Sequence, residues 1–155
     1  MAEEIDIDTL GEQVDFKIEK EDWGTYILSD GTKLMARVIL RDAIRRGEDA
    51  HGISLAYSVM VPVRVVAQDD VKSHMKGKPL KIGPVPLDKE HGWEEVEIVK
   101  TERPAISHYI IDSYRVTIKL EIISVIRTLK YKDPGGNPLY NVRWNTTLKI
   151  SKLRR

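Results

Sequence analysis

The sequence predicts an all-β protein built from a duplicated three-stranded unit, arranged as a β-sandwich or as a pair of small barrels. Three observations support this prediction. Apolar residues recur at every second position in several stretches, as in strands with one buried face. Turn residues such as Asp30-Gly31 separate these stretches. The same order of stretches occurs twice, about 83 positions apart.

The first half carries its clearest strand signal in the row Tyr57, Val59, Val61, Val63 and Val65. Pro62 interrupts this row and lacks a backbone N–H, which indicates an edge strand or a bulge. Upstream, Asp30-Gly31 lies between two β-prone runs and predicts a tight hairpin turn. A strand is expected from Leu34 to about Ile44.

The second half repeats this pattern. Alternating apolar residues run from Val116 to Ile122, and a second row runs from Tyr140 to Ile150. The turn between them, residues 133–138, is rich in proline and glycine. Aligning the halves places Tyr26 on Tyr109 and Tyr57 on Tyr140. Two such units, each with an exposed apolar face, would bury that face against one another.

The predicted organisation has four parts. Residues 1–12 form an acidic arm, 13–67 the first β unit, 68–92 a long loop, and 93–155 the second β unit, with 13–155 as one compact domain as the alternative. Val14, Phe16 and Ile18 alternate with polar residues and predict a half-buried strand at the start of the first unit.

The composition limits the classes of protein and of site that fit. With 32% charged residues and no cysteine, the chain is thermophile-like and has neither disulfides nor thiol chemistry. The first residues lack the basic start and apolar run of a signal peptide, and no stretch approaches a membrane span. We therefore expect a soluble, cytoplasmic protein without a membrane partner.

The charges are distributed unevenly along the chain. Residues 1–22 hold nine acids and two lysines, for a net charge of −7, whereas residues 127–155 hold eight bases and one acid, for +7. Ends of opposite charge can attract one another, within a chain or between copies. Solvation of both ends is the alternative interpretation.

The sequence shows no arrangement typical of a metal site, a cofactor site or a catalytic site. The four histidines have no metal-binding spacing, although His91 lies close to Glu94 and Glu95. Adjacent carboxylates at 69–70 and 94–95 would point to opposite faces of a strand. We expect no catalytic residue, no metal and no cofactor. Three tryptophans and four tyrosines could form a ligand platform, but packing in the core or at its rim is favoured.

The leading functional hypothesis is a non-enzymatic binding or assembly protein that self-associates, or joins a larger complex, through strand edges and charged ends. The alternative is a nucleic-acid-binding β module, because flexible basic segments can contact phosphates. The residues predicted for anion or nucleic-acid binding are Lys72, His74, Lys76, Lys78, Lys81, Arg143, Lys149, Lys152, Arg154 and Arg155. A third hypothesis, a ligand site or active site assembled only in three dimensions, predicts a pocket near the 68–92 loop.

Overall fold

The computed structural model describes residues 11–154, and it confirms the all-β prediction: 62% of these residues are in strands and 6% are in helices. The elements in chain order are β1 (Glu12–Gln13), β2 (Lys17–Glu21), β3 (Gly24–Leu28), β4 (Lys33–Ala36), β5 (Ile39–Asp49), β6 (Gly52–Met60), β7 (Val63–Val66), α1 (Asp69–His74), the 3-10 turn η2 (Lys89–His91), β8 (Glu94–Val96), β9 (Ile98–Arg103), β10 (Ile106–Ile111), β11 (Tyr114–Lys132) and β12 (Pro138–Lys152).

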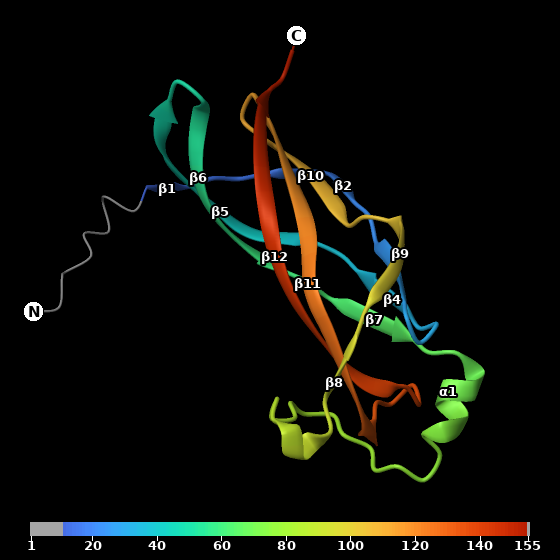
Figure 1. Cartoon of the computed structure of the whole chain (residues 1–155). Helices are drawn as coiled ribbons and strands as arrows, with labels where there is room; N and C mark the ends of the chain where they lie inside the picture. The colour runs from blue at the N-terminus through green and yellow to red at the C-terminus, as the bar shows by residue number, and fades with distance from the viewer. Residues whose placement is uncertain (1–10, 155) are drawn as a thin grey trace, which may run out of the picture.

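The strands form three antiparallel sheets in an elongated molecule (Figure 1). One sheet has the order β1-β5-β6, the second has the order β7-β4-β3-β9, and the third has the order β12-β11-β10-β2 with β8 also paired to β11. None of them closes into a barrel within the described residues, so the paired-barrel version of the prediction is wrong. The long strands β11 and β12 run along most of the molecule (Figure 1).

One apolar core joins the sheets. Alternate residues of β4 and β11, including Leu34, Ala36, Val116 and Ile118, are fully buried, as the period-two pattern predicts. Tyr109 is also buried in this core, where its hydroxyl accepts a hydrogen bond from the backbone N–H of Leu40.

The predicted turn at Asp30-Gly31 is confirmed. Gly31 has a φ of +82°, a conformation that favours glycine. The Asp30 carboxylate accepts a hydrogen bond from the backbone N–H of Thr32. Pro62 lies in the break between β6 and β7, in agreement with its predicted place at a bulge or edge.

In two ladders, a strand from one half of the chain pairs with a strand from the other half. β2 comes just before β3 in the chain but pairs with β10 of the second half. In the same way, β9 comes just before β10 but pairs with β3 of the first half. The two pairings have the same register: Lys20 lies opposite His108, and Thr25 lies opposite Arg103. Lys20 and Arg103 are 83 positions apart, as are Thr25 and His108. Both ladders also shift register just before a tyrosine, Tyr109 or Tyr26.

Other features of the ladders recur at a spacing of 82 positions. The β5·β6 ladder shifts register after Leu40, and the β11·β12 ladder shifts after Ile122, 82 positions later. Likewise, β1 pairs Glu12 with Arg45, and β8 pairs Glu94 with Arg127. These agreements favour the predicted duplication, which stays a prediction.

The alignment of the third strand needs a correction. The sequence comparison placed Tyr57 on Tyr140, but Arg45 pairs with Leu55 and Arg127 pairs with Tyr140. By strand pairing, the position that corresponds to Tyr140 is Leu55 and not Tyr57, so the predicted alignment of the third rows is displaced by two residues. A displacement of two keeps every side chain on the same face, so the alternation of apolar residues could not reveal it.

Three other expectations are changed by the structure. The 68–92 loop contains α1 and η2. The predicted strand at 14–18 begins later, at Lys17, and Ile18 is 55% exposed rather than half-buried. Most of the predicted arm, residues 1–10, lies outside the described residues, and Glu12 already belongs to β1.

Candidate binding edge

The last strand, β12, has one open edge. It spans 15 residues and pairs with β11 alone among the strands of residues 11–154. Its nearest neighbour on the open side is β6, where the hydroxyls of Tyr57 and Thr146 lie 2.9 Å apart. Beyond that contact β6 and β12 diverge, with the β5–β6 hairpin pointing away (Figure 1). An edge strand presents backbone N–H and C=O groups that a further strand can pair with.

The two faces of β12 differ in polarity. The inward row is apolar and half-buried, although the β11 residues beside it, such as Val116 and Ile118, are fully buried. Trp144, in this inward row, is 37% exposed, so it lies at the rim of the core. The outward row is polar and exposed, and it comprises Asn141, Arg143, Asn145, Thr147, Lys149 and Ser151.

The bases of the C-terminal segment fall into two groups. Arg127 is engaged inside the molecule, where its guanidinium contacts the carboxylates of Asp30 and Glu94, each at 2.8 Å. Arg143, Lys149, Lys152 and Arg154 are exposed, and they form no ion pair within residues 11–154. Arg155, the last predicted site residue, lies outside the described part of the chain.

The predicted basic residues lie on two segments, the 68–92 segment and β12 with the residues after it. His74, Lys76, Lys78 and Lys81 are exposed, and Lys72 lies half-buried in α1. Of the β12 bases, Lys149 and Lys152 belong to the end of the strand away from α1 (Figure 1), whereas Arg143 is two residues from Asn141, which lines a pocket together with Lys81. The Lys81 ammonium is placed over the ring of Tyr131, 5.8 Å from its centroid. The nucleic-acid-binding alternative, which needs these residues along one backbone path, stays a prediction.

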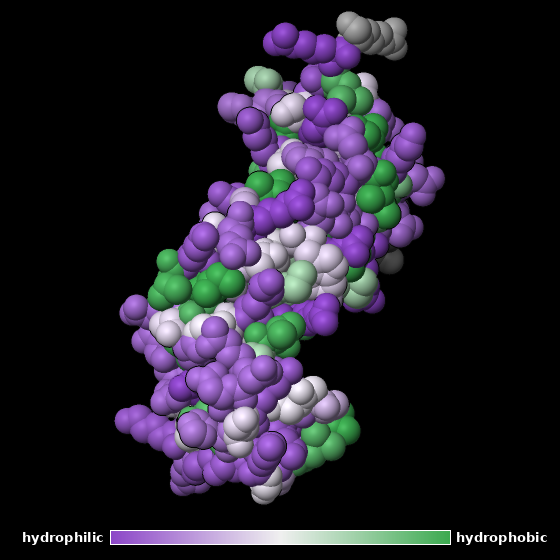
Figure 2. Space-filling view, turned by 90° about the vertical axis from the view of Figure 1, so that its right-hand side faces the viewer, coloured by the Kyte–Doolittle hydropathy of each residue, from purple (hydrophilic) through white to green (hydrophobic). Residues whose placement is uncertain are grey.

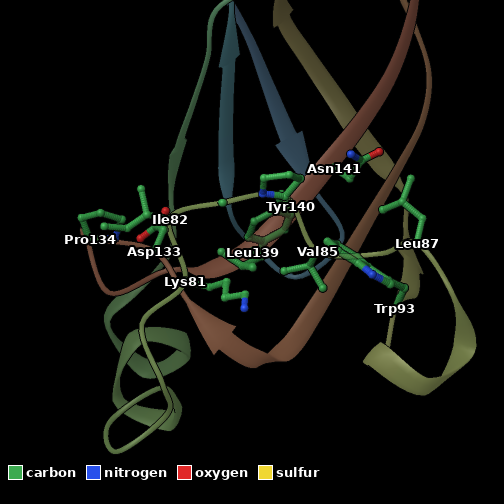
Figure 3. Close-up of a pocket in the computed structure, with 12 residues that line it drawn as sticks. Lys81, Ile82, Val85, Leu87, Trp93, Asp133, Pro134, Leu139, Tyr140 and Asn141 are labelled. Carbon is green, nitrogen blue, oxygen red and sulfur yellow. The ribbon is translucent and has the colours of Figure 1, made fainter.

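An open pocket of about 400 Å³ lies between the 68–92 loop and the start of β12 (Figure 3). It is lined largely by apolar side chains, among them Val85, Leu87, Trp93, Leu139 and Tyr140. Ile82, at its rim, is 83% exposed, and Leu87 is 60% exposed. On the face shown in Figure 2, hydrophobic side chains form separate patches on a mainly hydrophilic surface. A pocket near this loop is what the third hypothesis predicted.

Most polar groups of this pocket are already engaged. The Trp93 indole N–H donates to the carbonyl of Pro86, and the Asp133 carboxylate accepts hydrogen bonds from Asn137. The Tyr140 hydroxyl donates to Asp30 and lies 2.9 Å from the Thr32 hydroxyl. Such a pocket suits an apolar side chain better than a polar substrate.

The Tyr140 hydroxyl belongs to a polar cluster that ties the β3–β4 turn to β11 and β12. Partial burial and the hydrogen bond to Asp30 raise the pKa of Tyr140 to about 12. Burial alone would raise the pKa of Asp30, but hydrogen bonds from Tyr140 and Thr32, together with the charge of Arg127, lower it. Sequence reasoning missed this cluster, because it counted Arg127 among the tail charges and Asp30 only as a turn residue.

The residues considered for metal binding or catalysis are separated or paired otherwise. His91 contacts Asp88 rather than Glu94, and hydrogen bonds from His91 lower the pKa of Asp88. Glu94 is paired with Arg127. In the described residues, no group of three histidine or carboxylate side chains could hold a metal ion.

Comparison with known proteins provides no family for this chain: no family model, no curated protein and no solved structure matches it. Within residues 11–154, neither helical segment has the length or the apolar character needed to cross a membrane.

Proposed function

We propose that this chain is a non-enzymatic assembly protein that binds further copies of itself through the open edge of β12. The observation that carries the proposal is the edge itself: 15 residues that lack a strand partner on one side in the described residues. Strand addition to such an edge is a common mode of protein association, because the added backbone supplies hydrogen bonds along its whole length.

The two rows of β12 support this proposal. A half-buried apolar row, with Trp144 at the rim, leaves apolar surface for a neighbouring strand to cover. The outward bases Arg143 and Lys149 oppose pairing of β12 with β12 of another copy, because like charges would meet across the ladder. They favour a strand that is acidic on its outer face.

The predicted duplication belongs to the same proposal. We infer that the two halves are copies of one unit, supported by the shared registers of the β2·β10 and β9·β3 ladders. Exchange of β2 and β9 between the halves is how two copies of such a unit would associate. The β2·β10 and β9·β3 ladders within the chain would then resemble the strand pairing that joins one copy to another.

The proposal is tested by sedimentation velocity over a wide range of protein concentration. The Trp144→Lys variant places a charge on the inward row of the open edge, a device that prevents strand addition. We expect it to remain monomeric where the unmodified protein assembles. Val99→Lys is the control, since Val99 is an exposed apolar residue of another edge strand, β9.

Two results would contradict the proposal. One is a protein that stays monomeric at every concentration. The other is equal assembly of the Trp144→Lys variant and the unmodified chain.

A filter-binding assay at low salt tests the alternative hypothesis. Retention of DNA or RNA that is lost when Lys76 and Lys78 are replaced would favour a nucleic-acid-binding module instead.

A further inference from the structure

The charge and pattern of β12 specify which strand it would accept. Its outward row carries Arg143 and Lys149 without carboxylate partners in the described residues, and its inward row is apolar. A complementary strand therefore has acids at alternate positions and β-branched apolar residues between them. The chain itself contains such a segment at its N-terminus.

In residues 4–8 of the sequence, Glu4, Asp6 and Asp8 alternate with Ile5 and Ile7. If this segment were extended, all three carboxylates would lie on one face and both isoleucines on the other. Paired with β12, the carboxylates would lie beside the outward bases, and the isoleucines would cover the apolar row around Trp144 and Leu148. We propose that the N-terminal arm of one copy binds the open edge of β12 of a second copy.

The position where the described chain begins favours a second copy over the same chain. Gly11 lies against the backbone of Arg45, and β1 pairs with β5 on the side away from β6. β12 lies on the β6 side. Glu4 is seven residues before Gly11, so it lies at most about 23 Å from Gly11 when the chain between them is fully extended. Crossing β5 and β6 would use part of that length and leave a shorter segment to pair with β12.

This contact joins two different surfaces, an arm and an edge, so it is head-to-tail. Such contacts form a ring when the rotation between copies closes, and a filament when it does not. Charge attraction would contribute to the contact, and assembly should therefore weaken as salt is added. This inference rests on the proposed function, and it names the segment that occupies the edge.

A charge-exchange experiment on the full chain tests the inference. The arm variant is Asp6→Lys with Asp8→Lys, and the edge variant is Arg143→Glu with Lys149→Glu. Each should raise the dissociation constant for assembly by at least about tenfold, a change of about 1.4 kcal/mol. Combining both variants in one chain restores opposite charges and should recover most of the affinity. Lys33→Glu with Lys76→Glu is the control for net charge, since both lysines are exposed and lie outside β12.

The outcomes separate the two proposals. Loss of assembly in both variants, with recovery in the combination, supports the arm-to-edge contact. If both variants assemble like the unmodified chain, the inference fails while the proposed function survives. If the unmodified chain never assembles, both proposals fail.

Hydrogen exchange of residues 143–151 covers the case of an arm bound within its own chain. The unmodified protein is compared with the Asp6→Lys, Asp8→Lys variant at low and high protein concentration, because pairing of β12 with β11 protects part of these amides in both proteins. Additional protection in the unmodified protein that is independent of protein concentration would place the arm on its own β12, and it would overturn the inference.

Discussion

At the scale of single residues, two arginines bind carboxylates across the halves of the chain. Arg127 of the second half contacts Asp30 of the first at 2.8 Å, and Arg45 of the first half contacts Asp112 of the second at 3.0 Å. Arg127 thus contacts the turn between β3 and β4, and Arg45 contacts the turn between β10 and β11. The two ion pairs differ in exposure: the Arg127 and Asp30 side chains are 20% and 10% exposed, against 32% and 57% for Arg45 and Asp112.

Replacing Arg127 with alanine should therefore destabilise the protein more than replacing Arg45. Arg127→Ala leaves the shielded Asp30 carboxylate without its cation, and we expect a loss of about 2 kcal/mol in the free energy of unfolding. Arg45→Ala removes ion pairs with Asp112 and Glu48, whose carboxylates are both more than half exposed, and should cost less than about 1 kcal/mol. Urea denaturation of both variants measures the difference, and equal losses would contradict it.

The buried tyrosines predict how stability depends on alkaline pH. The pKa values of Tyr109 and Tyr140 are raised to about 12, whereas a tyrosine in the unfolded chain ionises near pH 10. Between these values the folded state retains protons that the unfolded state releases, so stability is complete below pH 10 and falls as the pH rises toward 12. Chemical denaturation from pH 8 to 11.5 should show this decline.

The Tyr140→Phe variant should lose part of the alkaline decline, because one of the hydroxyls whose pKa is raised is absent. Tyr131→Phe is the control, since its side chain forms no hydrogen bond in the described residues. An unfolding free energy that stays constant between pH 10 and 11.5 would contradict the account.

At the scale of elements, the exchanged strands can be tested by engineered disulfides, since the chain has no native cysteine. Cysteines at Lys20 and His108, or at Thr25 and Arg103, lie opposite one another and should form disulfides within one chain. Without exchange, β2 would instead pair with β3, and cysteines at Lys20 and Thr25 would be opposite.

Mobility on non-reducing gels identifies which pairs form. The account predicts intrachain disulfides for 20–108 and 25–103, and none for 20–25. A 20–25 disulfide in place of the other two would show that the halves do not exchange strands. Disulfides between chains at 20–108 would show that the exchange takes place between copies.

These elements also show what the sequence could predict. Alternation reports which face of a strand is buried, so the core rows of β4, β11 and β12 were predictable. The Asp30-Gly31 turn was predictable from its local conformational preference. Alternation does not report which strand lies alongside, so the exchange of β2 and β9 and the two-residue displacement of the third strand needed coordinates.

The candidate edge was predictable only in part. The sequence shows the bases of β12 and the net charge of +7 for residues 127–155. That net charge includes Arg127, which is paired with Asp30 inside the molecule. Composition groups the 68–92 lysines with the C-terminal bases, but it does not reveal that Lys149 and Lys152 belong to the end of β12 away from α1.

At the scale of the whole molecule, opposite charges in the N-terminal and C-terminal segments predict salt-dependent assembly. Within the first segment, Glu19 and Asp22 are already paired with Arg115 and Arg103. The acids of residues 3–8 and the exposed bases of β12 are therefore the charges we assign to contacts between copies. Raising the salt from 50 to 500 mM should shift the protein toward monomer in light scattering, and stronger assembly at high salt would indicate a mainly apolar interface.

The central claim is that the open edge of β12 is where copies of this chain meet. Hydrogen exchange of the backbone amides of β12, measured by mass spectrometry at low and high protein concentration, tests it most directly. The account predicts that peptides covering residues 143–151 become protected as the concentration rises, while the exposed tip of the β5–β6 hairpin keeps exchanging at the same rate. Assembly without added protection in β12 would contradict the claim.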